Sequence, residues 1–229
     1  PDAVVATTVL QLASAERDAA RFAAVARQDI FEPGAMTALD SAETQARLGE
    51  ATPALSMSSA QVVAPPTIRA AWIGETLAAR VARLERDGDG WRLLDAAGGL
   101  ILCAEAVVVA GGAASVGLDP ALPLRPVRGQ ASWAKGVTTT APAAFGGYAI
   151  PTREGVLFGA THDRDETAVD VRDEDHVRNL ATLAKGLPRL AERLAGGTFE
   201  GRAALRATVP DHMPIAGARA DGLGLLTGL

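Results

Sequence analysis

The unbroken apolar run from Ala106 to Ala110, which ends at Gly111-Gly112, places the strongest constraint on the fold. A short run that is apolar at every position is typical of a strand covered on both faces, as in the parallel sheet of an α/β domain. Paired glycines let a ligand approach the backbone at the carboxyl end of such a sheet, where cofactors bind. A helix C-cap or a plain turn is the alternative. The run therefore predicts part of a cofactor-binding α/β domain.

Most of the remaining strand patterns indicate antiparallel pairing. Two β-branched or mixed apolar stretches, residues 7–13 and 122–133, are predicted to be strands. Residues 81–102 predict an antiparallel meander with turns at Asp87-Gly90 and Asp95-Gly99, and residues 148–160 predict a hairpin. The mixture of patterns predicts an α+β fold, in which an antiparallel sheet with helices on one face accompanies an incomplete Rossmann-like portion.

Five stretches carry helix signals. Ser14 is a plausible N-cap for a helix to about Gln28, and the Asp40 to Glu43 spacing is that of a capping box. Pro65-Pro66 predicts a helix entrance, with an apolar stripe that continues to Leu77. Acidic residues at 173–175 and a proline at 188 predict two consecutive helices. Residues 49–58 have weak signals and are predicted to be a loop.

Two arginines four residues apart, Arg202 and Arg206, mark a candidate anion site. If residues 198–209 form a strand, both side chains point to the same face. The guanidinium group is a planar fork suited to bidentate pairing with a carboxylate or phosphate. Solvated arginines, or arginines paired with nearby acidic residues, are an equally good interpretation of this stretch alone.

Composition limits the classes of function. The 229 residues are 48% hydrophobic and 21% charged, which is ordinary for a globular protein, and the net charge of -5 does not favour a general nucleic-acid-binding surface. A local basic patch stays possible. No run of about 18 apolar residues predicts a membrane span, and no signal peptide is visible. A single cysteine, Cys103, fits a reducing compartment, so a cytoplasmic location is expected.

No metal site or nucleophilic catalytic group emerges from the sequence. His162, His176 and His212 lack ligand spacing with Cys103 and are predicted to be structural or surface residues. The chain does not begin with Met, and its last residues resemble a strand that ends at a glycine turn. We therefore expect a piece of a longer protein.

Taken in order, several of these segments resemble the FAD-dependent amino acid oxidases, a family that includes glycine oxidase, sarcosine oxidase and D-amino acid oxidase. The segments are Val107 to Gly112, Leu124 to Gln130, the Tyr148 to Thr161 hairpin, and Leu205 to Gly217. Within that family the chain is most similar to the oxidoreductase halves of bifunctional tRNA-modifying enzymes. The resemblance implies a substrate-binding domain in residues 1–58 and 119–215, and a partial FAD-binding domain in residues 59–118 and 216–229.

The resemblance also implies roles for individual residues. Arg206 would clamp the substrate carboxylate and Tyr148 would line the same pocket, whereas Arg202 would support that site or contact tRNA. Seven residues would border FAD: Val81, Ala110, Gly111, Arg128, Gly129, Gln130 and Gly228. The family's amino-terminal Gly-x-Gly-x-x-Gly turn, which holds the FAD pyrophosphate, is absent, so this fragment is expected not to retain FAD by itself.

The implied reaction is oxidation of a carboxymethylaminomethyl group on a tRNA wobble uridine. Hydride would pass from its α-carbon to flavin N5, and the resulting imine would hydrolyse to glyoxylate and the aminomethyl uridine. A methyltransferase domain upstream in the parent chain is a further expectation. A free amino acid or sarcosine-type oxidase is the alternative within the family, and a non-catalytic module for anions or RNA is the alternative of another class.

Overall fold

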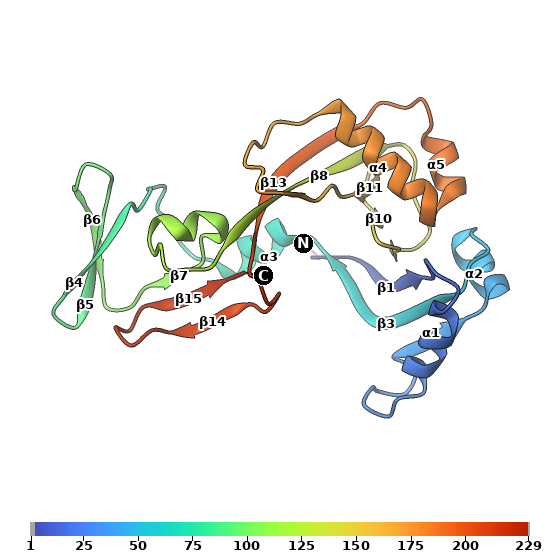
Figure 1. Ribbon diagram of the computed structural model, residues 1–229, viewed down its shortest axis with the longest axis horizontal. Coiled ribbons are helices and arrows are strands. Elements are labelled where there is room, and N and C mark those ends of the chain that lie inside the picture. Colours follow the sequence, from blue (N-terminus) through green and yellow to red (C-terminus); the bar gives the residue numbers. More distant parts are fainter. Residues whose placement is uncertain (1–2, 229) are drawn as a thin grey trace. The chain divides into compact units, whose positions relative to one another are not determined.

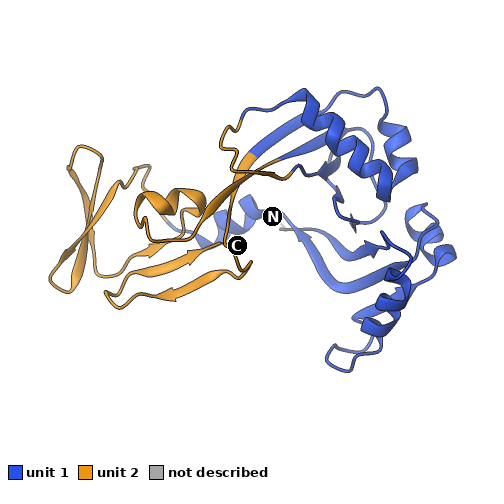
Figure 2. Ribbon diagram, viewed as in Figure 1, with its two compact units in different colours: residues 1–74, 130–161, 170–203 blue, residues 75–129, 162–169, 204–229 orange. Residues whose placement is uncertain are grey.

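The computed structural model describes residues 3–228, which form two compact units (Figure 2). Each unit is assembled from three separate stretches of the chain. Unit 1 contains the described residues within 1–74, 130–161 and 170–203, and unit 2 contains those within 75–129, 162–169 and 204–228. This division is geometric, and the functional domains with boundaries after residues 58, 118 and 215 stay a prediction.

Unit 1 is built on a sheet whose order is β8-β11-β10-β9-β1-β3-β2 (Figure 1). Adjacent strands are antiparallel except for the parallel β1-β9 pair. The strands are β1 (Val4–Leu12), β2 (Met36–Leu39), β3 (Ala54–Val63), β9 (Ala143–Ala144), β10 (Tyr148–Pro151), β11 (Gly155–Gly159) and the second half of β8 (Arg125–Lys135).

Unit 1 also contains helices, some of which close the core of the sheet. They are α1 (Asp18–Ala26), α2 (Ser41–Leu48), α3 (Pro65–Trp72), α4 (Asp173–Gly186) and α5 (Pro188–Leu194). Leucines on one side of α4 and α5, including Leu183 and Leu190, pack with Leu10, Val156 and Phe158 of the strands. Burial of such apolar surface is the main source of stability in a unit of this kind.

Unit 2 contains two small sheets and a short ribbon. An antiparallel meander is formed by β4 (Arg83–Asp87), β5 (Gly90–Leu94) and β6 (Leu100–Ala104). In the second sheet, β7 (Val108–Val109) pairs in parallel with β15 (Gly224–Thr227), which pairs with β14 (Ile215–Ala218). A 3-10 helix, η1 (Gly112–Gly117), follows β7. The ribbon consists of β12 (Asp163–Arg164) and the unit 2 ends of β8 and β13 (Glu200–Thr208).

Strands β8 and β13 each contribute residues to both units and run antiparallel. In unit 2 the Thr208 hydroxyl donates a hydrogen bond to the Arg125 carbonyl oxygen, at 3.1 Å. In unit 1 Lys135 Nζ lies 2.6 Å from Glu200 Oε1. The hydrogen bond and the charge of Glu200 raise the pKa of Lys135. These contacts join opposite ends of the two strands, which fixes their antiparallel direction.

The predicted mixed α+β class is confirmed, as are the meander, the hairpin, the capping box and the consecutive helices α4 and α5. The apolar run at 106–110 contributes a parallel strand, as expected, but it is not covered on both faces. Val109 is 4% exposed and packs with Trp91 and Leu223, whereas Val108 is 63% exposed.

Three local predictions are wrong. Residues 54–58 belong to β3 rather than to a loop, because pairing with β1 and β2 fixes a segment of weak intrinsic preference. Helix α1 begins at Asp18 with Arg17 as its N-cap, so Ser14 does not cap it. Helix α3 ends at Trp72, and Ile73 is extended. No residue of α3 is buried, so the apolar stripe predicted to reach Leu77 is not stabilised by packing.

Among residues 3–228, no helix has both the length and the apolar character that a membrane crossing requires.

Candidate functional site

The guanidinium group of Arg206 lies against the backbone of Gly129 in unit 2. A Cβ atom built on Gly129 would overlap Arg206 Nη1 and would lie 2.7 Å from Cζ. Real Cβ atoms do not approach other atoms this closely, so the observed position of Arg206 requires glycine on the neighbouring strand. Two residues predicted to belong to the site are therefore brought together.

The strands explain why these two residues meet. Gly129 is an interior residue of β8 and Arg206 an interior residue of β13, and the strands pair. Interior glycine in a strand often marks a close approach of another group. Here that group is the guanidinium fork of the Arg206 side chain. A fork of this kind is suited to bidentate binding of a carboxylate.

The residues on either side of Gly129 are engaged in holding neighbouring segments. In unit 2, Arg128 is completely buried, its Nε donates to the Ala168 carbonyl oxygen at 2.8 Å, and its Nη1 lies 3.7 Å from Asp163 Oδ2. In unit 1, Gln130 donates to the Arg172 carbonyl oxygen at 2.7 Å and accepts from the Arg172 amide at 2.8 Å. Both side chains therefore hold strand β8 against neighbouring segments. Their contact with flavin stays a prediction.

Three of the predicted cofactor residues lie at one edge of the second sheet of unit 2. Ala110 and Gly111 follow β7, and Gly228 follows the parallel neighbour β15. The Thr227 hydroxyl donates to the Gly112 carbonyl oxygen at 3.5 Å, which joins the two strand ends. Carboxyl ends of parallel strands are where open α/β sheets bind cofactors, so this edge fits the predicted contact.

The same edge contains a buried polar atom without a partner. Ser115 Oγ in η1 is inaccessible to solvent and makes no hydrogen bond within the described residues. A Cβ atom on Gly111 would lie 3.4 Å from it. Buried hydroxyl groups are normally hydrogen-bonded, and leaving one unpaired costs about 1–3 kcal/mol. This orphaned atom is consistent with an edge that is completed by a ligand.

Val81 and Tyr148 lie elsewhere in their units. Val81 is half-buried directly before the meander, where the next amide, Ala82 N–H, donates to the Leu94 carbonyl oxygen. The meander packs on the second sheet through Trp91 and Val109. Tyr148 is half-buried on β10 of unit 1, where it pairs with Gly159. The cofactor role of Val81 and the substrate role of Tyr148 stay predictions.

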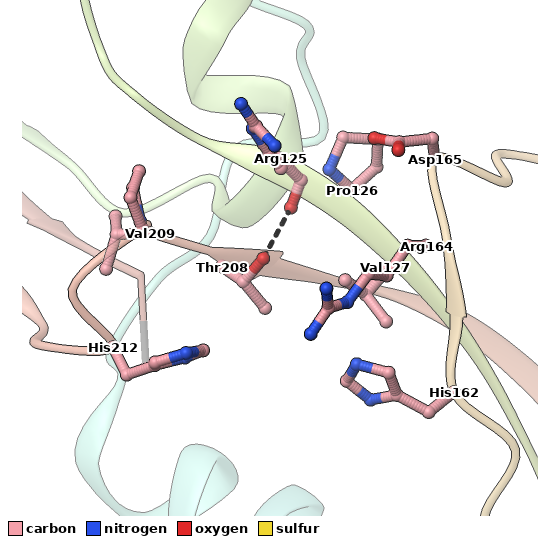
Figure 3. A pocket seen from close by; sticks show the side chains of 10 residues that line it. Arg125, Pro126, Val127, His162, Arg164, Asp165, Thr208, Val209 and His212 are labelled. Carbon is pink, nitrogen blue, oxygen red and sulfur yellow. Dashed lines mark hydrogen bonds between the residues drawn. The ribbon is translucent and has the colours of Figure 1, made fainter.

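A cleft of about 280 Å³ lies beside the β8-β13 ribbon (Figure 3). It lies wholly within unit 2. Its lining residues are Arg125, Pro126, Val127, His162, Arg164, Asp165, Thr208, Val209, Pro210 and His212. With two arginines and two histidines against one carboxylate, the cleft is suited to an anion.

Sequence reasoning missed the cleft. The sequence predicts structural or surface positions for His162 and His212, and it indicates no role for Arg125 or Arg164. These four residues are distributed over three segments that only the pairing of β8 with β12 and β13 brings together. The available signal was the high density of Arg and His in the stretches at 125–128 and 162–164. Within residues 3–228, no group of three or more His, Cys, Asp or Glu residues is placed to hold a metal ion.

The sequence matches a known family over nearly its whole length. A family model described as FAD dependent oxidoreductase matches residues 2–229. The chain is 64% identical over 230 residues to the tRNA 5-methylaminomethyl-2-thiouridine biosynthesis bifunctional protein MnmC of Caulobacter vibrioides, and 53% identical over 234 residues to the protein of the same name from Caulobacter sp. strain K31. All of this chain is covered in both comparisons, and it spans 39% of the length of each relative.

The fold is similar to that of solved oxidases. The crystal structure of glycine oxidase from Geobacillus kaustophilus superposes with a TM-score of 0.83 at 23% sequence identity. The superposition covers 99% of this chain and 66% of that one. At this level of identity, the similarity establishes the fold.

Proposed function

Because this chain belongs to the FAD-dependent oxidoreductase family, we propose that it supplies the substrate clamp and part of the cofactor site of a tRNA-modifying oxidoreductase. The substrate is the carboxymethylaminomethyl group of a wobble uridine, an N-substituted glycine whose carboxymethyl carbons leave as glyoxylate. The names of the two Caulobacter relatives support a tRNA substrate, and their word bifunctional supports a second activity in a longer chain. We propose that this second activity is that of a methyltransferase. A cytoplasmic location belongs to the same proposal.

The position of Arg206 over Gly129 carries the proposal. A carboxylate bound by the guanidinium fork holds the adjoining α-carbon and its amine in one orientation. The amine needs only to be neutral, so no general base is required from this chain. Tyr148 is proposed to contribute to the same substrate pocket.

FAD, when bound, supplies the two-electron oxidation of the carbon–nitrogen bond. The chain's own contribution is to hold one part of the cofactor through backbone groups. Ala110, Gly111 and Gly228 would do so at the joined ends of β7 and β15, where Ser115 Oγ lacks a partner. Arg128 and Gln130 keep β8 in place on both sides of Gly129.

The test compares Arg206→Ala with Arg202→Ala in the intact enzyme. Both arginines are exposed and lie four residues apart on β13, so the two variants remove equal charge from one strand. With the mononucleoside 5-carboxymethylaminomethyl-uridine as substrate, we expect Arg206→Ala to raise KM about 100-fold, as loss of a bidentate charged contact predicts. Arg202→Ala should change KM less than threefold.

Flavin absorbance of each purified variant shows whether the cofactor site is intact. An unchanged KM in a flavin-loaded Arg206→Ala enzyme would mean that another group holds the carboxylate. Faster turnover of free glycine or sarcosine than of the nucleoside would support the free amino acid oxidase instead. Failure of the intact enzyme to bind FAD would support a non-catalytic binding module.

A further inference from the structure

The two arginines of the cleft differ from most other arginines of unit 2. Arg83, Arg92, Arg128 and Arg219 each lie within 4 Å of a carboxylate. Arg125 and Arg164 make no ion pair with any residue in the range 3–228. Figure 3 shows the Arg125 guanidinium directed away from the side of the cleft where Arg164 lies. Arg164 is therefore a cation without a carboxylate partner beside a cleft, an arrangement that points to an external anion.

The basic and acidic side chains around the cleft point in different directions. Figure 3 shows His162, Arg164 and His212 around one shared space, whereas the Asp165 carboxylate points away from it. A neutral imidazole supplies one N–H donor, and a guanidinium group supplies five. The space therefore has several donors facing it and no carboxylate.

The size of the cleft selects among anionic ligands. Its volume of about 280 Å³ lies below the 300–1,000 Å³ that is typical of pockets for whole small molecules. It suits a single anionic group of a longer ligand better than an entire dinucleotide. The net charge of -5 further indicates that this is a local site and not part of a broad basic surface.

The cleft adjoins the proposed carboxylate clamp along the ribbon. Val127 lines the cleft two residues before Gly129, and Thr208 lines it two residues after Arg206. Strand alternation puts each of these residues on the same face as its partner in the clamp, roughly 7 Å away along the strand. One nucleotide can span that distance between its base substituent and a phosphate.

We propose that the cleft binds a phosphodiester group of the RNA that carries the substrate uridine. Arg164 supplies the charge, and the His162 and His212 rings supply further donors. Contacts of this kind position a nucleic acid without reading its sequence. The inference rests on the proposed tRNA substrate and identifies where that substrate's backbone is held.

The test measures RNA affinity separately from catalysis. An unmodified anticodon stem-loop RNA with a fluorescent label is titrated with the intact enzyme between 50 and 200 mM salt, and anisotropy gives Kd. Arg164→Gln should weaken binding about tenfold and lower the salt dependence, the slope of log K against log salt, by about 1. Arg80→Gln removes an exposed arginine of unit 2 outside the cleft and should change neither quantity.

Equal salt slopes for Arg164→Gln and the unsubstituted enzyme would overturn the proposal. So would an equal loss in Arg80→Gln, which would indicate a general charge effect. A variant that loses affinity for FAD or inorganic phosphate but keeps its RNA affinity would assign the cleft to another phosphate. Because no turnover is measured, failure here is distinguishable from an unchanged nucleoside KM in Arg206→Ala.

Discussion

Two polar clusters in this chain have opposite characters. In unit 1, a buried network joins Gln130, Ser132, His176 and Asn179. Asn179 Nδ2 lies 2.8 Å from the Gln130 carbonyl oxygen and 2.9 Å from Ser132 Oγ, and Ser132 Oγ lies 2.7 Å from His176 Nδ1. In unit 2, the cleft residues Arg125 and Arg164 have no carboxylate partner among the described residues.

This contrast indicates that the buried network of unit 1 serves stability, whereas the cleft of unit 2 serves binding. Asn179 donates to Ser132, which leaves the Ser132 hydroxyl to donate to His176, so each of these groups has a partner. A satisfied buried network specifies one packing arrangement and is costly to interrupt. The arginines of the cleft are exposed and have no carboxylate partner among the described residues, so they should contribute little to the free energy of folding. Substitutions should therefore act on unfolding in the first cluster and on ligand affinity in the second.

The largest effect on stability is expected at Asn179. Asn179→Ala removes the donor to Gln130 and Ser132 at a buried position, so the free energy of unfolding should fall by about 2–4 kcal/mol. Urea denaturation followed by far-UV circular dichroism measures it. Gln28→Ala, at an exposed position, should change stability by less than about 0.5 kcal/mol.

A second comparison uses Asn179→Asp, which preserves shape but replaces the donor with an acceptor. The carboxylate would then face the Gln130 carbonyl oxygen, so this variant should be at least as unstable as Asn179→Ala. If Asn179→Ala and Asn179→Asp both had near-wild-type stability, the buried network would not be a source of stability, and it would no longer differ from the cleft in this respect.

An intermediate effect is expected at Asp18, a buried carboxylate that accepts several hydrogen bonds. Its Oδ2 accepts from the Ser14 and Ala15 amides, both at 2.9 Å. The pKa of Asp18 is lowered, chiefly by the bond from Ser14. A lowered folded-state pKa means that the ionised carboxylate stabilises the fold above the unfolded value near 4 and loses this contribution as pH falls.

Asp18→Asn should therefore be destabilised relative to the parent at pH 7 and less so at pH 3. Denaturation midpoints at the two pH values, compared at equal salt, measure the difference. A destabilisation that does not change with pH would show that Asp18→Asn acts through altered packing or hydrogen-bond geometry and not through the loss of the carboxylate charge.

The smallest effect on stability is expected at Arg164. Arg164→Gln removes an exposed, unpaired cation, so the free energy of unfolding should stay within about 0.5 kcal/mol of the parent. The same urea assay measures it. A loss above 1 kcal/mol would show that Arg164 supports the fold, and the contrast between the clusters would then fail.

Local chemistry made part of the fold predictable. The Asp40 capping box forms as its spacing predicts, with Glu43 N–H donating to Asp40 and the Asp40 amide donating to Glu43, each at 2.8 Å. Helix α4 begins at Asp173, in an acidic first turn. Signals of this kind lie within a few residues of each other, so the sequence records them directly.

The parts of the fold and of the candidate site that depend on long-range strand pairing could not be predicted from the sequence. Residues 54–58 of β3 have weak preferences of their own and depend on pairing with β1 and β2. The cleft depends on β8 and β13, whose paired residues are far apart in the sequence. Spacing alone marked Arg202 and Arg206 as equals. Only the structure shows which of them lies on the backbone of Gly129.

The contact between Arg206 and Gly129 has an evolutionary consequence. The Arg206 guanidinium group occupies the space that a Cβ atom at position 129 would need. Any residue larger than glycine at position 129 therefore requires that the side chain at position 206 be displaced or shorter. The two positions should therefore show epistasis, with Gly129→Ala damaging function only while arginine is present at 206. Among descendants of a common ancestor, glycine at 129 should persist as long as the clamp does.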